Sequence, residues 1–164
     1  MRVAIISDIH DALPNLTAAL AQLANANVLI CCGDLCSPFV IDYLARGFTG
    51  PIHIVFGNND GDLFRITQQA NKSTNITLHG HIAELSVGSK RFAVNHYPEI
   101  ARGLALSDRY DVVCFGHNHT YEATREGTTL LINPGEIFGG LSGCATCATY
   151  DSELDQVTRH DLHS

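Results

Sequence analysis

Nearly continuous apolar runs alternate with segments of helical periodicity over the first third of the chain. The runs at residues 2–7, 28–32 and 51–56 are typical of strands that are buried on both faces. Between the first two runs, apolar residues recur at the spacing of a helix, at Leu16, Ala19, Leu20 and Leu23. This alternation of strand and helix predicts parallel βαβ units.

Proline and small polar residues indicate where the helices begin. Pro14 fits the first turn of the first helix, and Ser37-Pro38 predicts an N-cap followed by Pro at the first helical position. The second helix then extends to about Arg46. Asn15 either caps the first helix or reaches from it toward a site at the edge of the sheet.

The second half of the chain has the pattern of β-structure. Segments 81–87 and 91–95 flank Gly88-Ser89-Lys90, which predicts a hairpin, and segment 99–107 predicts a short helix. Further runs predict strands at 111–115, 121–125, 129–133, 144–150 and 154–160. We expect these strands to form antiparallel pairs.

Together these patterns predict an α/β (α+β) fold, a two-sheet β sandwich flanked by helices. The length fits one domain over residues 1–164, with 45% apolar and 16% charged residues. No apolar run approaches the roughly 20 residues of a membrane span, and the N-terminus lacks the pattern of a signal peptide. We therefore expect a cytoplasmic protein with no membrane partner.

The charge and the cysteines of the chain limit the partners and structural bonds that we expect. A formal net charge of -7 with 10 Lys and Arg argues against nucleic acid as a large polyanionic partner. Cys144 and Cys147 have the C-x-x-C spacing, but residues three apart in a strand face opposite sides, which is poor geometry for a shared metal. Buried reduced thiols are therefore the better interpretation of the six cysteines. His53 is interpreted as a satisfied core or interface histidine, whereas His79 and His81 are expected to face solvent.

Polar side chains follow five of the predicted strands, at the point where each strand ends. They are Asp8, His10, Asp34, Asn58, His96, His117 and His119. Ligands of α/β sheets gather outside the carboxyl ends of strands, so we expect these side chains to meet at one edge. Carboxylate, amide carbonyl and imidazole groups suit Mn, Fe, Co, Ni or Zn. No cysteine fits the set, which disfavours a structural zinc site of the cysteine type.

The order of these residues along the chain resembles that of a known enzyme family. The segments that carry the likeness to calcineurin-like metallophosphoesterases are Asp8-Ile9-His10, Gly33-Asp34, Gly57-Asn58-Asn59-Asp60, His96 and Gly116-His117-Asn118-His119. Asn133-Pro134-Gly135 resembles a further loop of the family. The short chain is similar to the small single-domain bacterial and archaeal phosphodiesterase branch.

The resemblance implies a dinuclear centre of two divalent metal ions, with Mn expected and Fe, Ni, Co or Zn as alternatives. The ligands that it implies are Asp8, His10 and His119 for the first ion, Asn58, His96 and His117 for the second, and Asp34 as the bridge. It further implies a metal-dependent hydrolase of phosphoester bonds, foremost a phosphodiesterase, in which a bridging hydroxide attacks phosphorus.

Neighbouring positions depart from the family pattern or add to it. Asn59 stands where many members have histidine. An amide can donate a hydrogen bond to phosphate but cannot protonate a leaving group. This difference favours diesters or activated esters as substrates. We assign Asn59 and Asp60 to the catalytic group, with Asp60 orienting a neighbouring donor or else serving as a turn residue. Asn59 and Tyr97 are assigned to substrate binding, and Tyr97 otherwise packs. Glu136 either narrows the pocket, contacts substrate or faces solvent.

Other functions would use the same residues. A phosphomonoesterase or nucleotidase, or a protein phosphatase, needs the same metals. A non-catalytic scaffold of the same fold would be expected to lose ligands, and none of the seven is missing. Metal storage or sensing predicts metal uptake without turnover. We expect a small phosphoester as the substrate, and exposed β edges leave a homo-oligomer open.

Overall fold

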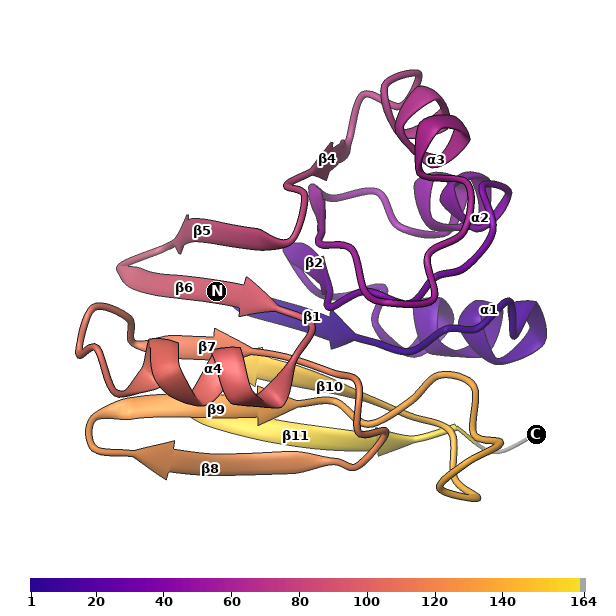
Figure 1. The fold of residues 1–164 in the computed structure, drawn as a ribbon. Coiled ribbons are helices and arrows are strands. Elements are labelled where there is room, and N and C mark those ends of the chain that lie inside the picture. Colours follow the sequence, from indigo (N-terminus) through magenta and orange to yellow (C-terminus); the bar gives the residue numbers. More distant parts are fainter. Residues whose placement is uncertain (163–164) are drawn as a thin grey trace.

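Two packed β-sheets form the centre of the molecule in a computed structural model that describes residues 1–162 (Figure 1). The strands of the first sheet, in spatial order, are β11 (Gln156–Asp161), β10 (Thr146–Asp151), β1 (Arg2–Ile6), β2 (Val28–Cys31), β3 (Ile52–Ile54) and β4 (Ile76–Leu78). Those of the second sheet are β5 (Ile82–Val87), β6 (Lys90–Asn95), β7 (Val112–Cys114), β9 (Thr129–Asn133) and β8 (Glu122–Glu126).

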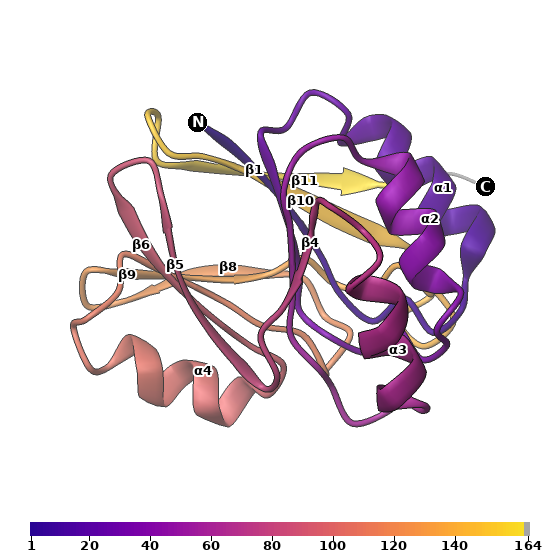
Figure 2. The same ribbon diagram turned by 90° about the horizontal axis from the view of Figure 1, so that it is seen from above.

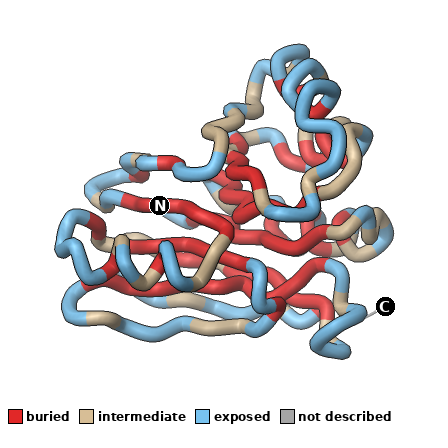
Figure 3. Tube along the Cα trace, in the orientation of Figure 1, coloured by how far each residue is buried: buried red, intermediate tan, exposed pale blue. Residues whose placement is uncertain are grey.

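Helices cover the outer face of each sheet, as the view from above shows (Figure 2). The helices α1 (Leu13–Gln22), α2 (Val40–Gly47) and α3 (Leu63–Ala70) pack on the first sheet. On the other side of the molecule, α4 (Pro98–Ala105) packs on β6, β7 and β9. The layers therefore run helix, sheet, sheet, helix, and the buried residues are concentrated in the strands between the helices (Figure 3).

The alternation of side chains in β1 explains its unbroken apolar run. Val3 and Ile5 belong to the core between the two sheets, whereas Ala4 and Ile6 belong to the core beneath the helices. Residues 3–6 therefore have no position that faces water, and all four are apolar, whereas Arg2 at the start of the strand is exposed. The predicted sandwich with flanking helices is confirmed, as are the parallel pairs of β1, β2 and β3.

Two elements between β3 and β5 are absent from the sequence-based prediction. The helix α3 has only two buried residues, Ile66 and Ala70, so its apolar face is too short to give a clear period. Its start is marked by Asp62, whose carboxylate accepts a hydrogen bond from the Arg65 N–H at 3.1 Å. The strand β4 has three residues and joins the edge of the first sheet beside β3.

The predicted start of α2 is wrong. The helix begins at Val40, and its N-cap position is Phe39, which makes no capping side-chain hydrogen bond. Ser37 is used elsewhere, because its hydroxyl donates to the Asp11 carboxylate at 2.6 Å. The Ser37 side chain therefore binds Asp11, in another loop, and does not cap α2.

Pairing in the second half is only partly antiparallel. The hairpins β5–β6, β8–β9 and β10–β11 are antiparallel as expected. However, β7 pairs in parallel with both β6 and β9, and β10 returns to the first sheet to pair antiparallel with β1. The second sheet therefore also has parallel strands whose carboxyl ends point one way.

The remaining thiols and histidines lie mostly in the interior. All six cysteines are free, and four of them are buried; Cys36 and Cys144 are partly exposed, which corrects the expectation for those two. His53 and His79 are half-buried and contact each other at 2.9 Å between Nδ1 and Nε2, so the prediction that His79 faces solvent is wrong. Within residues 1–162, no helix combines the length and apolar character needed to cross a membrane.

Candidate metal centre

The loops that follow β1, β2, β3, β6 and β7 meet at one edge of the sandwich. Loops from the same sheet are joined by backbone hydrogen bonds, such as Ile9 N–H to the Asp34 carbonyl at 2.9 Å. Loops from different sheets are joined as well, because Asp8 Oδ2 accepts from the His117 N–H at 3.1 Å. The carboxyl ends of parallel strands in both sheets thus face a common space, where all seven predicted ligands lie.

Strained backbone turns these ligands inward. Five of the seven have positive φ angles, which are Asp8 (53°), His10 (43°), Asp34 (55°), His117 (73°) and His119 (59°). Left-handed backbone at non-glycine residues costs about 1 kcal/mol or more each and persists where the surrounding structure enforces it. The sharp bends allow Asp8 and His10 to enter the same cluster, as their motif predicted. His117 and His119 instead enter two neighbouring clusters, so the prediction of one point is wrong for that pair.

Glycines next to the ligands permit their close approach. A methyl group on Gly57 would lie 2.1 Å from Asp34 Oδ1, and one on Gly116 would lie 2.6 Å from Asp8 Oδ2. At either distance the added methyl group would overlap the carboxylate oxygen. The glycines of the two motifs therefore serve the packing of the carboxylates against neighbouring loops.

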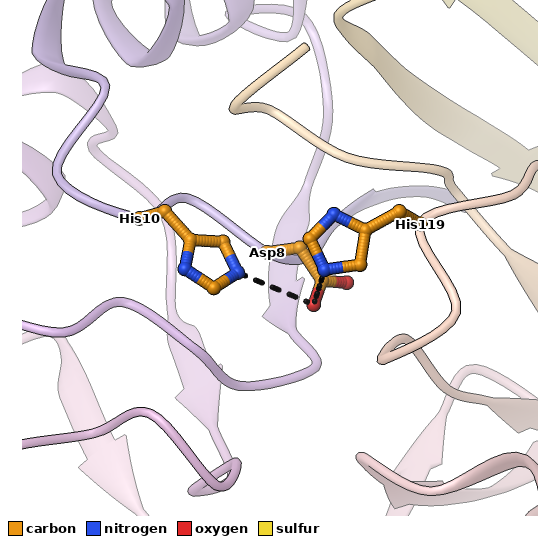
Figure 4. A group of neighbouring side chains, drawn as sticks. All are labelled: Asp8, His10 and His119. Carbon is orange, nitrogen blue, oxygen red and sulfur yellow. Dashed lines mark ion pairs between the residues drawn. The ribbon is translucent and has the colours of Figure 1, made fainter. Parts of the chain in front are cut away.

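Asp8, His10 and His119 form a first cluster, in which the imidazole Nε2 atoms face one carboxylate oxygen (Figure 4). Asp8 Oδ1 lies 3.8 Å from His10 Nε2 and 3.4 Å from His119 Nε2. Among the described residues, neither Asp8 Oδ1 nor His10 Nε2 has a hydrogen-bond partner, although both atoms are buried. Unsatisfied buried polar atoms are rare in proteins, and this arrangement fits a cation between them.

Asp34, Asn58, His96 and His117 form a second cluster beside the first. Asn58 Oδ1 lies 3.1 Å from His96 Nε2 and 2.8 Å from His117 Nδ1. Asp34 Oδ2 lies 3.4 Å from His96 Nε2 and also 3.5 Å from His10 Nε2 in the first cluster. One oxygen of Asp34 thus stands between the two clusters, where the family resemblance requires a shared ligand.

Electrostatic interactions in the centre favour positive charge. The carboxylate of Asp8 beside His10, supported by Asp34, raises the pKa of His10 despite its partial burial. Burial alone would raise the pKa of Asp34, but interactions with His96 and Asn59 outweigh it and hold that pKa well below its usual range. Burial would lower the pKa of His96, and Asp34 reverses this effect. Carboxylates surrounded by nitrogen ligands provide the donor set of a divalent metal site.

Asn59 and Asp60 both act on Asp34 in this structure. The Asn59 backbone N–H and side-chain amide donate to the two oxygens of Asp34, each at 2.8 Å. The Asp60 carboxylate accepts from four backbone N–H groups: those of Asp34, Leu35, Cys36 and Gly57. Asp60 therefore joins the loops after β2 and β3, which is the orienting alternative given above and not a turn residue's role.

Tyr97 lies over the second cluster. Its ring centroid is 5.2 Å from that of His96 and 5.2 Å from that of His117, in edge-to-face geometry with both. Its backbone N–H donates to Asn95 Oδ1 at 2.8 Å, which fixes the start of α4. The half-buried ring therefore packs on two predicted ligands at the border of the site.

Glu136 contradicts the alternatives predicted for it. The residue is fully buried, so it neither faces solvent nor lines an open pocket. Its Oε2 lies 2.6 Å from Nδ1 of His119. Asn15 likewise neither caps α1 nor enters the site; its amide donates to the carbonyls of Ile137 and Phe138 at 2.9 and 3.1 Å.

Several supporting contacts have no signal in the local sequence. The Cys32 carbonyl lies 2.8 Å from Nδ1 of His96, and the Phe138 ring centroid is 5.6 Å from that of His10. The Asn133-Pro134-Gly135 motif was the one available sign, since the Asn133 amide donates to the carbonyl of Gly116 at 3.1 Å and steadies the loop of His117 and His119.

Comparisons of sequence and structure relate the chain to known proteins. The profile of the calcineurin-like phosphoesterase superfamily domain matches residues 1–154. The chain is 31% identical over 157 residues to a phosphodiesterase from Methanocaldococcus jannaschii, an alignment that covers 93% of this chain and 94% of the relative. A solved archaeal phosphodiesterase superposes with a TM-score of 0.91 at 29% identity, covering 99% of this chain and 100% of the other.

A more distant likeness concerns the fold alone. Wild-type Vps29 from Entamoeba histolytica, solved in complex with Zn²⁺, superposes with a TM-score of 0.65 at 17% identity, covering 99% of this chain and 100% of the other.

Proposed function

The chain belongs to the calcineurin-like phosphoesterase superfamily and is a hydrolase of phosphoester bonds, and from this premise we propose that it is a phosphodiesterase with a dinuclear metal centre. The observation that carries the proposal is the pair of clusters that share Asp34 Oδ2, together with the unsatisfied buried atoms Asp8 Oδ1 and His10 Nε2. Two cations would satisfy these atoms and relieve the repulsion between the carboxylates.

The ligand assignment follows the clusters. Asp8, His10 and His119 would hold one ion, Asn58, His96 and His117 the other, and Asp34 both. Bound divalent ions supply Lewis-acid charge to a phosphoryl oxygen and activate water as a nucleophile. The chain contributes rigid placement, because the strained loops and the Asp60 carboxylate hold the ligands before substrate arrives.

Charge explains how an acidic protein would bind an anion. Five of the seven ligand side chains are neutral when they coordinate a metal, and the carboxylates of Asp8 and Asp34 do not cancel two divalent ions. The centre would therefore stay positive while the chain as a whole carries -7. This local field would attract a small phosphoester and stabilise the charge that develops on it.

The identity of residue 59 supports diesters with good leaving groups. The amide of Asn59 carries no transferable proton, and it is already donated to Asp34. Beside the site lies a cavity of about 310 Å³ lined by His117, Asn118, His119, Thr120, Leu141 and Ser142. One ester group of a small diester would fit there.

We further propose Mn as the metal in the cell, with Fe, Ni, Co and Zn as alternatives that the oxygen and imidazole ligands also accept. A cytoplasmic location is proposed because all six cysteines are free thiols, which reducing compartments maintain.

The proposal is tested on protein stripped of metal by a chelator. Added Mn should bind at two ions per chain and restore hydrolysis of bis(p-nitrophenyl) phosphate more than of p-nitrophenyl phosphate. It should also raise the thermal midpoint by roughly 10–20 °C when both sites are at a hundredfold excess over Kd. Asp34→Ala should abolish all three effects, whereas Glu153→Ala, at an exposed turn, should leave them unchanged.

Each alternative function gives a different result. No metal uptake and no turnover above Asp34→Ala would overturn the enzyme and favour a scaffold. Uptake of two ions without turnover would indicate storage or sensing. Faster hydrolysis of the monoester would overturn the substrate class while leaving the metal centre intact.

A further inference from the structure

Glu136 is a fully buried carboxylate in the loop between β9 and β10. Burial of a charge is unfavourable unless hydrogen bonds replace its water. The two oxygens of Glu136 have separate partners. Oε2 lies 2.6 Å from His119 Nδ1, while Oε1 accepts from the N–H groups of Leu141 and Ser142 at 3.0 and 2.5 Å and from the Ser142 hydroxyl at 2.7 Å.

The contact with His119 determines which ring nitrogen carries the proton. An ionised carboxylate accepts hydrogen bonds only, so the 2.6 Å contact requires a proton on Nδ1 of His119. The Nε2 lone pair is then free, and that atom is the one 3.4 Å from Asp8 Oδ1 in the first cluster. Carboxylates that hold the far nitrogen of a histidine ligand in this way orient the ring and raise its basicity.

The same loop also contacts the other two members of the first cluster. The Phe138 N–H donates to the Asp8 carbonyl at 3.0 Å, and the Phe138 ring lies against His10 at 5.6 Å between centroids. Through Oε1, Glu136 holds the turn at residues 141–142 that closes this loop. A change at Glu136 would therefore reach the ligands of the first ion and not those of the second.

We propose that Glu136 is a positioning residue for the first metal ion: it fixes His119 with Nε2 free and fastens the loop of Phe138 over the same cluster. The inference rests on the proposed function, since it assigns a residue to that centre.

Glu136→Gln is the sharpest perturbation, because it keeps the size of the side chain and removes one acceptor oxygen. If the remaining oxygen accepts from the loop, the new NH₂ group faces Nδ1 of His119 and drives the proton to Nε2. Titration with Co²⁺, followed by its visible absorption and by calorimetry, should then show one of two ions bound about 10–100-fold more weakly. Glu153→Gln, the same exchange at an exposed turn, should bind both ions as wild type does.

A second measurement needs no variant at this position. Long-range ¹H–¹⁵N NMR spectra of the metal-free wild type, with the ring assigned by His119→Gln, should show the proton on Nδ1. A proton on Nε2 of His119 in wild type would overturn the inference. Binding of both Co²⁺ ions to Glu136→Gln with the affinities of wild type would overturn it as well. Failure of wild type to bind Co²⁺ or Mn and to hydrolyse the diester would instead overturn the proposed function. If Glu136→Gln does not fold, the wild-type spectrum alone decides.

Discussion

Replacement of Asp60 by Asn tests whether this residue organises the metal centre or takes part in chemistry. Its Oδ1 accepts from the N–H groups of Leu35 and Cys36 at 2.8 and 2.9 Å, and its Oδ2 from those of Gly57 and Asp34 at 2.7 and 3.2 Å. An asparagine can turn its oxygen toward one pair of donors only. The other pair would then face an NH₂ group, which donates and cannot accept.

The size of the effect follows from these contacts. A buried donor left without an acceptor costs about 1–3 kcal/mol, and partial exposure of Asp60 places each of the two at the lower end. The sum is about 2–4 kcal/mol, which corresponds to a fall of roughly 4–16 °C in the thermal midpoint for a chain of this size. Because one of the donors is Asp34 N–H, metal affinity and turnover should fall as well.

The assay compares thermal unfolding of metal-free Asp60→Asn with that of Asp62→Asn. Asp62 caps α3 and is exposed, and asparagine caps helices equally well, so this control should stay within about 2 °C of wild type. If Asp60→Asn also stays within about 2 °C while hydrolysis is lost, the reasoning is refuted and Asp60 belongs with the catalytic residues.

Two further predictions concern a glycine and a histidine pair. Gly116→Ala should weaken metal binding by about 10–100-fold, because its methyl group would meet the Asp8 carboxylate. The control Gly103→Ala, with open space around it in α4, should bind metal normally and gain about 0.5–1 kcal/mol in the free energy of unfolding. Equal metal affinities of the two variants would contradict this prediction. The pKa values of His53 and His79 are lowered from 6.5 by burial and, for His53, also by the neighbouring His79. The stability that the neutral pair contributes is therefore present above pH 6.5 and is lost as the pH falls below that value. In urea unfolding, wild type should therefore lose more stability between pH 7 and about pH 5 than His79→Gln, which keeps a hydrogen bond but cannot titrate; equal losses would show that the pair does not contribute.

The sequence by itself determined which apolar runs form buried strands and which chemical groups follow them. Apolar runs must be buried, and polar residues that follow parallel strands must emerge at their carboxyl ends. Local pattern therefore suffices for β1, β2 and β3 and for the four predicted ligands that follow them. His96, His117 and His119 follow β6 and β7, whose parallel pairing only the structure shows. Residue type alone shows that these groups suit a divalent ion, because carboxylate, amide oxygen and imidazole have fixed donor properties. Their assignment to two ions is what the family resemblance implies.

Only the tertiary structure decided what surrounds those ligands. The partners of Asp60, the burial of Glu136 and its contact with His119, and the return of β10 to β1 all join segments far apart in the chain. No local period encodes such contacts, since they depend on how separate loops pack once the sheets have formed. A polar residue after a strand can therefore be recognised from its position, but whether it meets metal, another loop or solvent is settled by the segments that fold against it.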